Sequence, residues 1–373
     1  MTTPESPVLA RIARPTMLLD EARCLRNLER MAAKAQRSKV RFRPHFKTHQ
    51  SAQVGGWFRE FGVQAITVSS VKMAEYFAAQ GWNDITIAFP VNWREIGAIN
   101  GLASTTHLGL IIEAPETVRF LTEQLRHPVD AWIDVDTGYG RTGIAWDSTE
   151  EARALAGAIR SAETLNLRGL LTHAGHTYAA RSTAEIAQIY DETATHLASL
   201  RSDLGSAGFE GLELSVGDTP SCSVVDDLSG VDEIRPGNFV FYDVMQAALG
   251  SCATEDIAMA VACPVVARSA RRSQAVVQGG GVHLSKEFIL DPQGRRIYGA
   301  VAFPTAEGWG PPIESAYVSS LSQEHGVIQL DPTTFEQVRI GDLLVVLPIH
   351  SCMTADLLKS YLTLSGEHIS MMA

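Results

Sequence analysis

No stretch of this sequence approaches the ~18–20 consecutive apolar residues that a membrane-spanning helix requires, and basic residues are not in excess. The 31 Lys and Arg residues stand against 42 Asp and Glu residues. The resulting net charge of −11 argues against nucleic acid or an anionic membrane as a partner. The N-terminal segment lacks a basic region followed by an apolar core, so no secretion signal is expected.

Cysteine is also scarce. The five cysteines are an odd number without a Cys-x-x-Cys pair, at positions 24, 222, 252, 263 and 352. This pattern favours reduced thiols, and therefore a cytoplasmic protein, over a disulfide framework. With 45% hydrophobic and 20% charged residues over 373 positions, the composition is typical of a soluble globular protein with a sizeable core. The length allows two domains, or one barrel with an appended piece.

The first two thirds of the chain alternate between short apolar strands and amphipathic helices. The strands are expected at 40–43, 65–69, 84–88, 108–112, 131–134, 169–173, 212–216 and 233–235. The helices between them are expected at 20–36, 71–80, 114–125, 149–162 and 183–204. Eight strands with helical crossovers predict an α/β fold in the form of a (β/α)8 TIM-like barrel. After about residue 250 the pattern changes to strands without helices between them, at 257–267, 274–278, 327–330 and 343–347. This predicts an antiparallel β domain.

The segment 43–49, Arg-Pro-His-Phe-Lys-Thr-His, places Lys47 just after the first expected strand. A lysine boxed by a proline and two histidines is placed like a reactive amine, although a solubilising surface lysine has the same local signature. In a barrel, the carboxyl ends of the strands carry the chemistry. Lys47, Arg141, His173 and Gly217 all fall at or just beyond such ends, which favours a functional role for each.

A glycine-rich segment, Gly138-Tyr-Gly-Arg-Thr-Gly143, matches the dinucleotide fingerprint in form. The helix that should open on the third glycine is instead expected near Ser148, so a nucleotide site is disfavoured. Arg141, held in a tight glycine turn, suits a different role as a fixed donor to a ligand oxygen. His173-Ala-Gly-His176 ends another expected strand. These histidines are either buried structural residues or groups that stack on a planar cofactor and exchange protons.

Two loops follow the seventh and eighth expected strands, where barrels commonly hold phosphate. The first, 215–221, contains Gly217 and Thr219, and the second contains Gly237 and Asn238. Small residues with free N–H groups and hydroxyls suit phosphate binding. Asp218 would repel a phosphate, and a plain surface turn has the same composition.

His350 and Cys352 follow the last strand of the expected β domain. On an extended segment, residues two apart point their side chains the same way, so both could bind one ion. Imidazole with thiolate favours Zn²⁺ over Mg²⁺ or Ca²⁺. Two ligands are too few for a complete structural site but suffice for an open catalytic one.

Taken in order, these motifs resemble a known family. The matching segments are 43–49, Asp-Thr-Gly-x-x-Arg-Thr-Gly at 136–143, Thr-His-Ala-Gly-x-Thr-Tyr at 172–178, Ser-Val-Gly-x-Thr-Pro-Ser at 215–221, 233–243, 322–326 and Pro-x-His-x-Cys-x-Thr at 348–354. Over nearly its whole length the chain resembles the pyridoxal-phosphate enzymes of the alanine-racemase-like fold. Within them it resembles the branch of D-serine dehydratase, D-threonine aldolase and D-threo-3-hydroxyaspartate dehydratase.

The resemblance implies a barrel, residues 21–248, that binds pyridoxal 5'-phosphate. It also implies a β domain of residues 1–20 and 249–373 that carries a metal motif, a small D-amino acid substrate, and a homodimer. Lys47 would hold the cofactor as a Schiff base. The other residues implied to bind the cofactor are Arg141 at its ring oxygen, His173 against its ring, Arg235 at its ring nitrogen, and Tyr178, Gly217, Thr219, Gly237 and Asn238 around it. His350 and Cys352 would bind the metal, with zinc expected and manganese or magnesium as alternatives.

Asp218 departs from the small neutral residue that relatives generally have there. The resemblance predicts dehydration of a D-3-hydroxy amino acid, D-serine or D-threo-3-hydroxyaspartate, to a 2-oxo acid and ammonia. Lys47 would remove the Cα proton, and the metal would act as a Lewis acid on the β-hydroxyl.

Three other functions stay open. A D-threonine-type aldolase would use a base such as His176, but relatives that cleave this bond usually have His-x-Asp where this chain has Cys352. Arg235, like the racemase arginine, keeps racemisation open. A non-catalytic pyridoxal-phosphate-binding protein would lack the C-terminal domain.

Overall fold

The computed structural model describes residues 7–373, and these fall into two compact units. We call Glu29–Lys47 together with Gly55–Gly237 the barrel unit. The β unit comprises the described residues up to Leu28, Thr48–Val54 and Asn238–Ala373. The segment 48–54 therefore groups with the β unit, although it follows the first barrel strand. The N-terminal six residues, part of the segment for which no secretion signal is predicted, lie outside the described residues.

The barrel unit is built on eight parallel strands. They are β2 (Arg41–Phe42), β3 (Ile66–Val68), β4 (Asp84–Pro90), β5 (His107–Ile112), β6 (Val129–Asp136), β8 (Leu165–Leu171), β9 (Glu213–Val216) and β10 (Glu233–Ile234). They hydrogen-bond in the order β2-β10-β9-β8-β6-β5-β4-β3. A parallel bridge between His45 and Thr67 joins the chain after β2 to β3 and closes the ring. The predicted (β/α)8 barrel is confirmed, and each of the eight expected strands overlaps an observed one.

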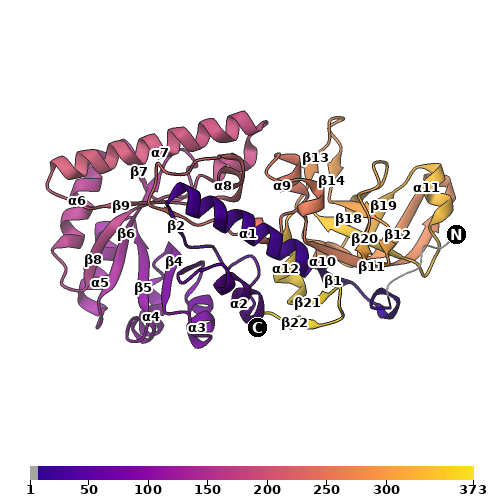
Figure 1. The fold of residues 1–373 in the computed structure, drawn as a ribbon, viewed down its shortest axis with the longest axis horizontal. Coiled ribbons are helices and arrows are strands. Elements are labelled where there is room, and N and C mark those ends of the chain that lie inside the picture. Colours follow the sequence, from indigo (N-terminus) through magenta and orange to yellow (C-terminus); the bar gives the residue numbers. More distant parts are fainter. Residues whose placement is uncertain (1–6) are drawn as a thin grey trace. The chain divides into compact units, whose positions relative to one another are not determined.

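Helices pack outside this ring, and their starts follow local sequence signals (Figure 1). They are α3 (Val71–Ala79), α4 (Ile96–Ala103), α5 (Pro115–Gln124), α6 (Thr149–Arg160), α7 (Thr183–Ser206) and the short α8 (Thr219–Val224). Ser70 caps α3 by accepting a hydrogen bond from the Met73 N–H, and Ser182 caps α7 in the same way from Glu185. Two further helices, α1 (Glu21–Ser38) and α2 (Ala52–Glu60), have residues in both units.

The β unit contains a nine-stranded sheet in the order β12-β19-β18-β15-β20-β11-β1-β21-β22. These strands are β1 (Thr16–Leu19), β11 (Met259–Ser269), β12 (Gln274–Gln278), β15 (Gly299–Ala302), β18 (Tyr317–Leu321), β19 (His325–Gln329), β20 (Leu343–Pro348), β21 (Ser360–Thr363) and β22 (His368–Ser370). The N-terminal strand β1 pairs antiparallel with β11. The sheet is antiparallel throughout except at β1 and β21, as predicted for the C-terminal part of the chain.

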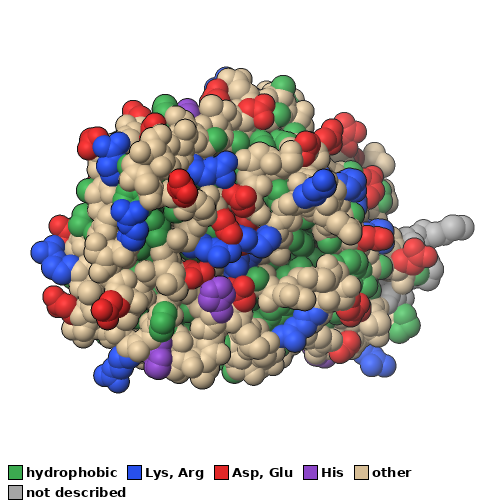
Figure 2. Space-filling model, turned by 60° about the vertical axis from the view of Figure 1, so that its left-hand side comes forward, with side chains coloured by type: hydrophobic (Ala, Val, Ile, Leu, Met, Phe, Trp, Pro, Cys, Tyr) green, Lys and Arg blue, Asp and Glu red, His purple; other side chains and the backbone are tan. Residues whose placement is uncertain are grey.

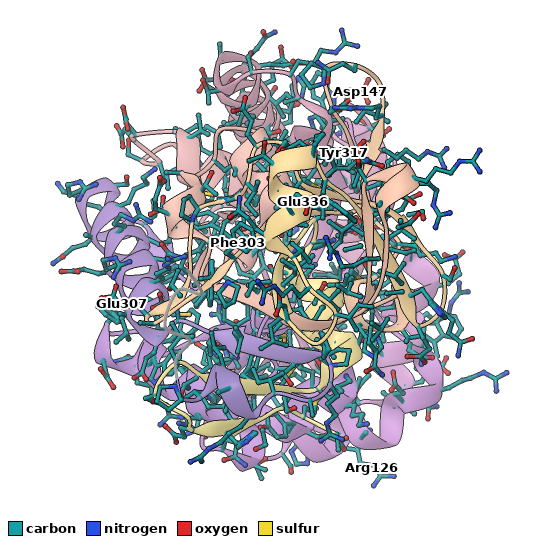
Figure 3. The ribbon with its side chains drawn as sticks, turned by 90° about the vertical axis from the view of Figure 1, so that its right-hand side faces the viewer. Arg126, Asp147, Phe303, Glu307, Tyr317 and Glu336 are labelled. Atoms are coloured by element: carbon teal, nitrogen blue, oxygen red, sulfur yellow. The ribbon has the colours of Figure 1, made fainter. Side chains whose placement is uncertain are left out.

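Apolar side chains from alternate positions of these strands form the core of the β unit. Val261, Cys263 and Val265 of β11 lie in it, and Phe303 packs against it (Figure 3). The smaller elements of this unit are α9 (Val244–Ala248), α10 (Gly281–Leu284), β13 (Ile289–Leu290), β14 (Arg296–Ile297), β16 (Pro304–Thr305), β17 (Gly308–Trp309), α11 (Pro332–Gln337) and α12 (Ser351–Leu358).

Across residues 7–373, no helix has the length and apolar character needed to cross a membrane. On the face shown in Figure 2, basic and acidic side chains are interspersed. That mixture agrees with the absence of a basic surplus in the sequence and offers no extended positive field for a polyanion on this face.

Candidate active site

Lys47 lies beyond the carboxyl end of β2, at the end of the barrel where the other strands also finish. The backbone before it is fixed, because His45 donates its N–H to Pro236 O and Phe46 donates to Thr67 O, at 2.9 and 2.8 Å. The Lys47 N–H in turn faces the His45 ring at 3.4 Å. The lysine side chain is exposed, while its neighbours Phe46 and His45 are buried. A backbone fixed by hydrogen bonds therefore presents an exposed amine at the barrel mouth.

Positive charge gathers around this amine. Burial, and after it the charge of Lys47, lowers the pKa of His173 to about 3. The same two causes hold the pKa of His45 well below its ordinary value. Arg141 and Arg235 act on both histidines in the same direction. Both imidazoles are therefore neutral near neutral pH, and Lys47, Arg141 and Arg235 supply positive groups suited to an anionic ligand.

The glycine-rich segment after β6 forms a turn that presents Arg141. Asp136 accepts hydrogen bonds from the N–H groups of Gly138 and Gly140, at 2.9 and 3.0 Å. Gly138, Gly140 and Gly143 all have positive φ angles, of 130°, 73° and 99°, which explains why glycine occupies each position. The next helix, α6, begins only at Thr149. The glycine-rich segment 138–143 thus forms a turn that does not lead into a helix, as a dinucleotide-binding loop would.

The histidine motif after β8 places two imidazoles near this loop. His173 Nδ1 hydrogen-bonds to the Gly217 carbonyl, and its ring centroid lies 6.4 Å from that of Tyr178. His176 stacks on Tyr139 with centroids 6.5 Å apart. Burial lowers the pKa of His176 from its ordinary value, and its buried Nδ1 has no hydrogen-bond partner among the described residues. His176 is therefore available for proton exchange at the barrel mouth.

The loop after β9 is organised by Asp218. Its Oδ1 accepts hydrogen bonds from the Ser221 N–H at 2.7 Å and from the Thr177 hydroxyl at 3.0 Å, which caps α8. Burial raises the pKa of Asp218 to about 6. The expected repulsion of a phosphate is therefore reduced, because the carboxylate is engaged with its own loop and resists ionisation. Thr219 Oγ1 is buried with no partner among residues 7–373.

Arg235 is held by a chain of hydrogen bonds inside the barrel. Its Nε donates to Ser215 Oγ at 2.7 Å, and the Ser215 hydroxyl donates to Glu233 Oε1 at 2.7 Å. Glu233 also accepts from Arg43 Nε at 2.7 Å. Burial lowers the pKa of Arg235 to about 10, so the guanidinium stays charged near neutral pH. Three buried side chains, Ser215, Glu233 and Arg43, thus fix the direction of the Arg235 guanidinium.

Gly237 is the last residue of the barrel unit, and Asn238 is the first residue of the C-terminal segment of the β unit. The Asn238 side-chain amide donates to Asp243 Oδ2 at 2.6 Å, to Ser351 Oγ at 3.0 Å and to Cys352 Sγ at 3.6 Å. Its side-chain amide is therefore committed within the β unit. A role for Asn238 at a phosphate is left to its backbone N–H.

In the β unit, His350 and Cys352 do come together, but not as predicted. The extended segment expected for these residues is wrong, because β20 ends at Pro348 and His350 is the N-cap of α12. Burial alone would lower the pKa of His350, but its contacts with Cys352 and Glu287 raise the pKa to about 11. The helical turn, rather than strand alternation, brings the imidazole and the thiol together.

Three residues that sequence reasoning did not single out complete these surroundings. Thr48 Oγ1 lies 3.2 Å from Cys352 Sγ, and Glu287 Oε2 lies 3.4 Å from His350 Nδ1. In the barrel unit, His45 lies beside Lys47. Thr48 and His45 belong to the lysine motif and could have been singled out there. Glu287 has no local motif, so nothing in the sequence marks it.

The residues of both units fit the groups that the resemblance implies. In the barrel unit, the unpartnered buried hydroxyl of Thr219 and the positive charge around Lys47 fit an anionic cofactor with a phosphate. In the β unit, an imidazole and a thiol fit a divalent metal such as zinc. Over residues 7–373, no three His, Cys, Asp or Glu side chains lie close enough to form a metal site. The pair therefore fits an ion that keeps open coordination positions.

Two family models match the chain. The model described as alanine racemase, N-terminal domain, matches residues 19–244. The model described as putative serine dehydratase domain matches residues 258–364. The first family is one of pyridoxal-phosphate-dependent enzymes. The two matches together span almost the whole of the described chain.

Three relatives carry names that bear on function. The chain is 28% identical to a D-threo-3-hydroxyaspartate dehydratase from Delftia sp. strain HT23, over 95% of this chain and 94% of the relative. It is 27% identical to a D-serine dehydratase from Dictyostelium discoideum, with the same coverage of 95% and 94%. It is 28% identical to a D-threonine aldolase from an Arthrobacter species, over 63% of this chain and 62% of the relative.

The solved Delftia dehydratase superposes with a TM-score of 0.90 at 27% identity, covering 98% of this chain and 99% of that structure. A mutant of the same dehydratase in the metal-free form also gives a TM-score of 0.90, at 27% identity over 97% of this chain and 98% of that one. The architecture is therefore shared over the full described length.

Proposed function

Since this chain belongs to the family of the alanine racemase N-terminal domain, we propose that it is a pyridoxal-phosphate- and metal-dependent lyase. It dehydrates a D-3-hydroxy amino acid, D-serine or D-threo-3-hydroxyaspartate, to a 2-oxo acid and ammonia. The observation that carries the proposal is the second family match, to a serine dehydratase domain over 258–364, because that segment contains both His350 and Cys352. Residues 21–248 would hold the cofactor, and residues 1–20 with 249–373 would hold the metal.

The barrel unit supplies the residues for the first event, which is removal of the Cα proton. Bound pyridoxal phosphate withdraws electrons from Cα and makes that proton acidic. Lys47 is the residue that would hold the cofactor and take the proton, since it is an exposed amine at the barrel mouth. Arg141 and the neutral His173 would orient the cofactor ring, and Arg235 would face its nitrogen. Tyr178, Gly217, Thr219, Gly237 and the Asn238 backbone would complete its binding.

The β unit supplies the residues for the second event, which is departure of the β-hydroxyl. A divalent metal supplies Lewis-acid chemistry that makes hydroxide a better leaving group. His350 and Cys352 would hold this ion, and thiolate with imidazole favours zinc, with manganese or magnesium as alternatives. Thr48 and Asn238 both lie within reach of the Cys352 sulfur, at 3.2 and 3.6 Å, so they would support it as a metal ligand.

The reaction balances without any oxidant or reductant. One proton leaves Cα and one hydroxide leaves Cβ, so water is lost and a carbon–carbon double bond forms. The released enamine takes a proton at Cβ, and water then replaces its nitrogen at Cα. The net products are one 2-oxo acid and one ammonium ion for each amino acid.

A panel of substrates tests the proposal. The holoenzyme is incubated with the D and L isomers of serine, threonine and threo-3-hydroxyaspartate, with and without a chelator. We expect 2-oxo acid and ammonia in equal amounts from D isomers, and a loss of this activity on chelation. Conversion of D to L isomer without loss of amino acid would instead identify a racemase.

A second candidate is a D-threonine-type aldolase, and the similarity to an Arthrobacter D-threonine aldolase favours keeping it. In that reaction a base takes the β-hydroxyl proton and the Cα–Cβ bond breaks, giving glycine and an aldehyde. His176, with its unpartnered Nδ1, would be that base. In the same panel, glycine and aldehyde from D-threonine would identify this activity.

We also propose that the enzyme is cytoplasmic and acts as a homodimer. None of the five cysteines forms a disulfide, which supports a reducing compartment. The dimer rests on the family resemblance alone. Light scattering coupled to size-exclusion chromatography measures the mass directly, and a value equal to one 40.4 kDa chain would contradict the dimer.

A further inference from the structure

We infer that Glu287 is a positioning residue for the metal site, which orients the His350 imidazole through Nδ1 and leaves Nε2 to bind the ion. The inference rests on the proposed function, because it takes His350 and Cys352 as the metal ligands. No motif pointed to Glu287, which lies 63 residues before His350 in the sequence. It extends the proposed site to a residue outside the two ligands.

The two side chains lie at ion-pair distance. Glu287 Oε2 is 3.4 Å from His350 Nδ1, a buried nitrogen that makes no hydrogen bond with good geometry among the described residues, so Glu287 is the acceptor within reach of it. The carboxylate comes from the short segment between α10 and β13, and the imidazole from the N-cap of α12. The side chains are 41% and 26% exposed, so the contact is partly shielded from water. Both residues belong to the β unit.

A histidine has two ring nitrogens, and a metal binds one of them. If the other is held by a carboxylate, the tautomer and the ring orientation are fixed before the metal arrives, and the imidazole becomes a better ligand. With Nδ1 facing Glu287, Nε2 is the nitrogen left to bind. Glu287 would support His350 as a metal ligand, as Thr48 and Asn238 would support Cys352.

Glu287 acts on His350 and is not itself a third ligand. Within residues 7–373, no three carboxylate, imidazole or thiol groups gather closely enough to share an ion. A carboxylate on Nδ1 is placed on the far side of the ring from Nε2. Glu287 would therefore raise the affinity for the metal and orient the His350 ring, without adding a ligand to the metal.

The β unit also offers a matched control. His283 Nε2 and Glu324 Oε2 lie 3.8 Å apart, and Glu324 is 50% exposed. This pair has the same chemistry and similar exposure, but His283 is not a proposed ligand. A general effect of removing one acidic residue from the β unit would appear equally in Glu324→Ala.

The test is the zinc affinity of the pyridoxal-phosphate-loaded protein, measured by competition with a chromophoric chelator. Wild type, Glu287→Ala, Glu287→Gln, Glu324→Ala and His350→Ala are compared. We expect Glu287→Ala to weaken binding about 10- to 100-fold. Glu287→Gln, which keeps an acceptor but loses the charge, is expected to lie between it and wild type. Glu324→Ala should match wild type, and His350→Ala should abolish tight binding.

Cobalt substitution gives a readout that is independent of activity. The thiolate-to-cobalt charge-transfer band should persist in Glu287→Ala at saturating metal, which shows that Cys352 still binds and that the fold is intact. Wild-type affinity in Glu287→Ala, with His350→Ala impaired, would overturn this inference and leave the proposed function standing. Equal losses in Glu287→Ala and Glu324→Ala would also overturn it. If wild type bound neither zinc nor manganese nor magnesium, both the inference and the proposed function would be overturned.

Discussion

At the scale of single residues, backbone hydrogen bonds fix the position of Lys47, and neighbouring side chains determine its electrostatic environment. The backbone hydrogen bonds of His45 and Phe46 hold the chain on each side of the barrel closure. Burial and the charge of Lys47 keep the imidazoles of His45 and His173 neutral, so two uncharged rings lie near the amine that is proposed to act as nucleophile and base.

Replacing Lys47 by alanine is therefore expected to remove the bound cofactor's visible absorbance band and to lower kcat/KM at least about a hundredfold. Lys72→Ala is a matched control, since Lys72 is an exposed lysine of the barrel unit in the first turn of α3. Absorbance spectra and initial rates of the two variants measure both effects. A wild-type spectrum in Lys47→Ala would contradict the assignment.

His176 has different expected roles in the two candidate reactions. A dehydratase takes its proton from Cα with Lys47, whereas an aldolase also needs a base at the β-hydroxyl. We expect His176→Asn to lower kcat/KM for D-serine dehydration by less than about tenfold, because the residue is not the α-base. A loss of about a hundredfold or more, the scale of a missing general base, would contradict this expectation and give His176 an acid–base role in the dehydration itself. Tyr139→Phe keeps the ring that stacks on His176 and serves as the control.

The raised pKa of Asp218 should make the free energy of unfolding depend on pH. Burial raises its pKa to about 6 from the ordinary value of 3.8, so the folded protein holds this proton more tightly than the unfolded chain. The cost of ionisation is absent below about pH 4, grows between about pH 4 and 6, and is fully present above that window. A shift of about two units corresponds to about 3 kcal/mol.

Asp218→Asn keeps an oxygen acceptor for Ser221 and Thr177 but removes the charge. The variant should gain free energy of unfolding relative to wild type as the pH rises from about 4 to about 7, by up to about 3 kcal/mol. Urea unfolding of both cofactor-free proteins across this range measures the difference. A difference that does not change with pH would contradict the raised pKa.

At the scale of elements, sequence patterns located the strands because buried parallel strands are short apolar runs bounded by turn residues. The run Leu212–Val216 became β9, and Leu108–Ile112 became β5. The extended conformation predicted for 348–352 was wrong, because an apolar run does not show where a strand ends and a helix begins. Glu287 could not be predicted, since its partner is set by tertiary packing and not by spacing.

Gly169 shows how closely two barrel strands approach. A Cβ on this residue of β8 would lie 2.1 Å from the carbonyl oxygen of Glu213 in β9. Gly169→Ala should therefore lower the free energy of unfolding by about 1–3 kcal/mol or more. Gly205→Ala, in α7 with no atom within 4 Å, should raise it by about 0.5–1 kcal/mol. Chemical denaturation measures both, and equal effects would contradict the packing argument.

At the scale of the whole molecule, the proposed chemistry is divided between the two units. The barrel unit contains Lys47, Arg141, His173 and Arg235, which suit cofactor chemistry shared by many reactions. The β unit contains His350 and Cys352, which suit a metal that selects the bond to be broken. The sequence could place these sets in different domains, because their strand patterns differ. It could not define the pocket wall that selects the substrate side chain.

The proposed function requires that the Cβ–O bond breaks and the Cα–Cβ bond does not. The ratio of 2-oxo acid to glycine formed from D-serine and from D-threo-3-hydroxyaspartate by the zinc- and cofactor-loaded enzyme measures this directly. We expect 2-oxo acid with one ammonia for each amino acid consumed, and no glycine. Glycine with an equal amount of aldehyde would contradict the proposed function.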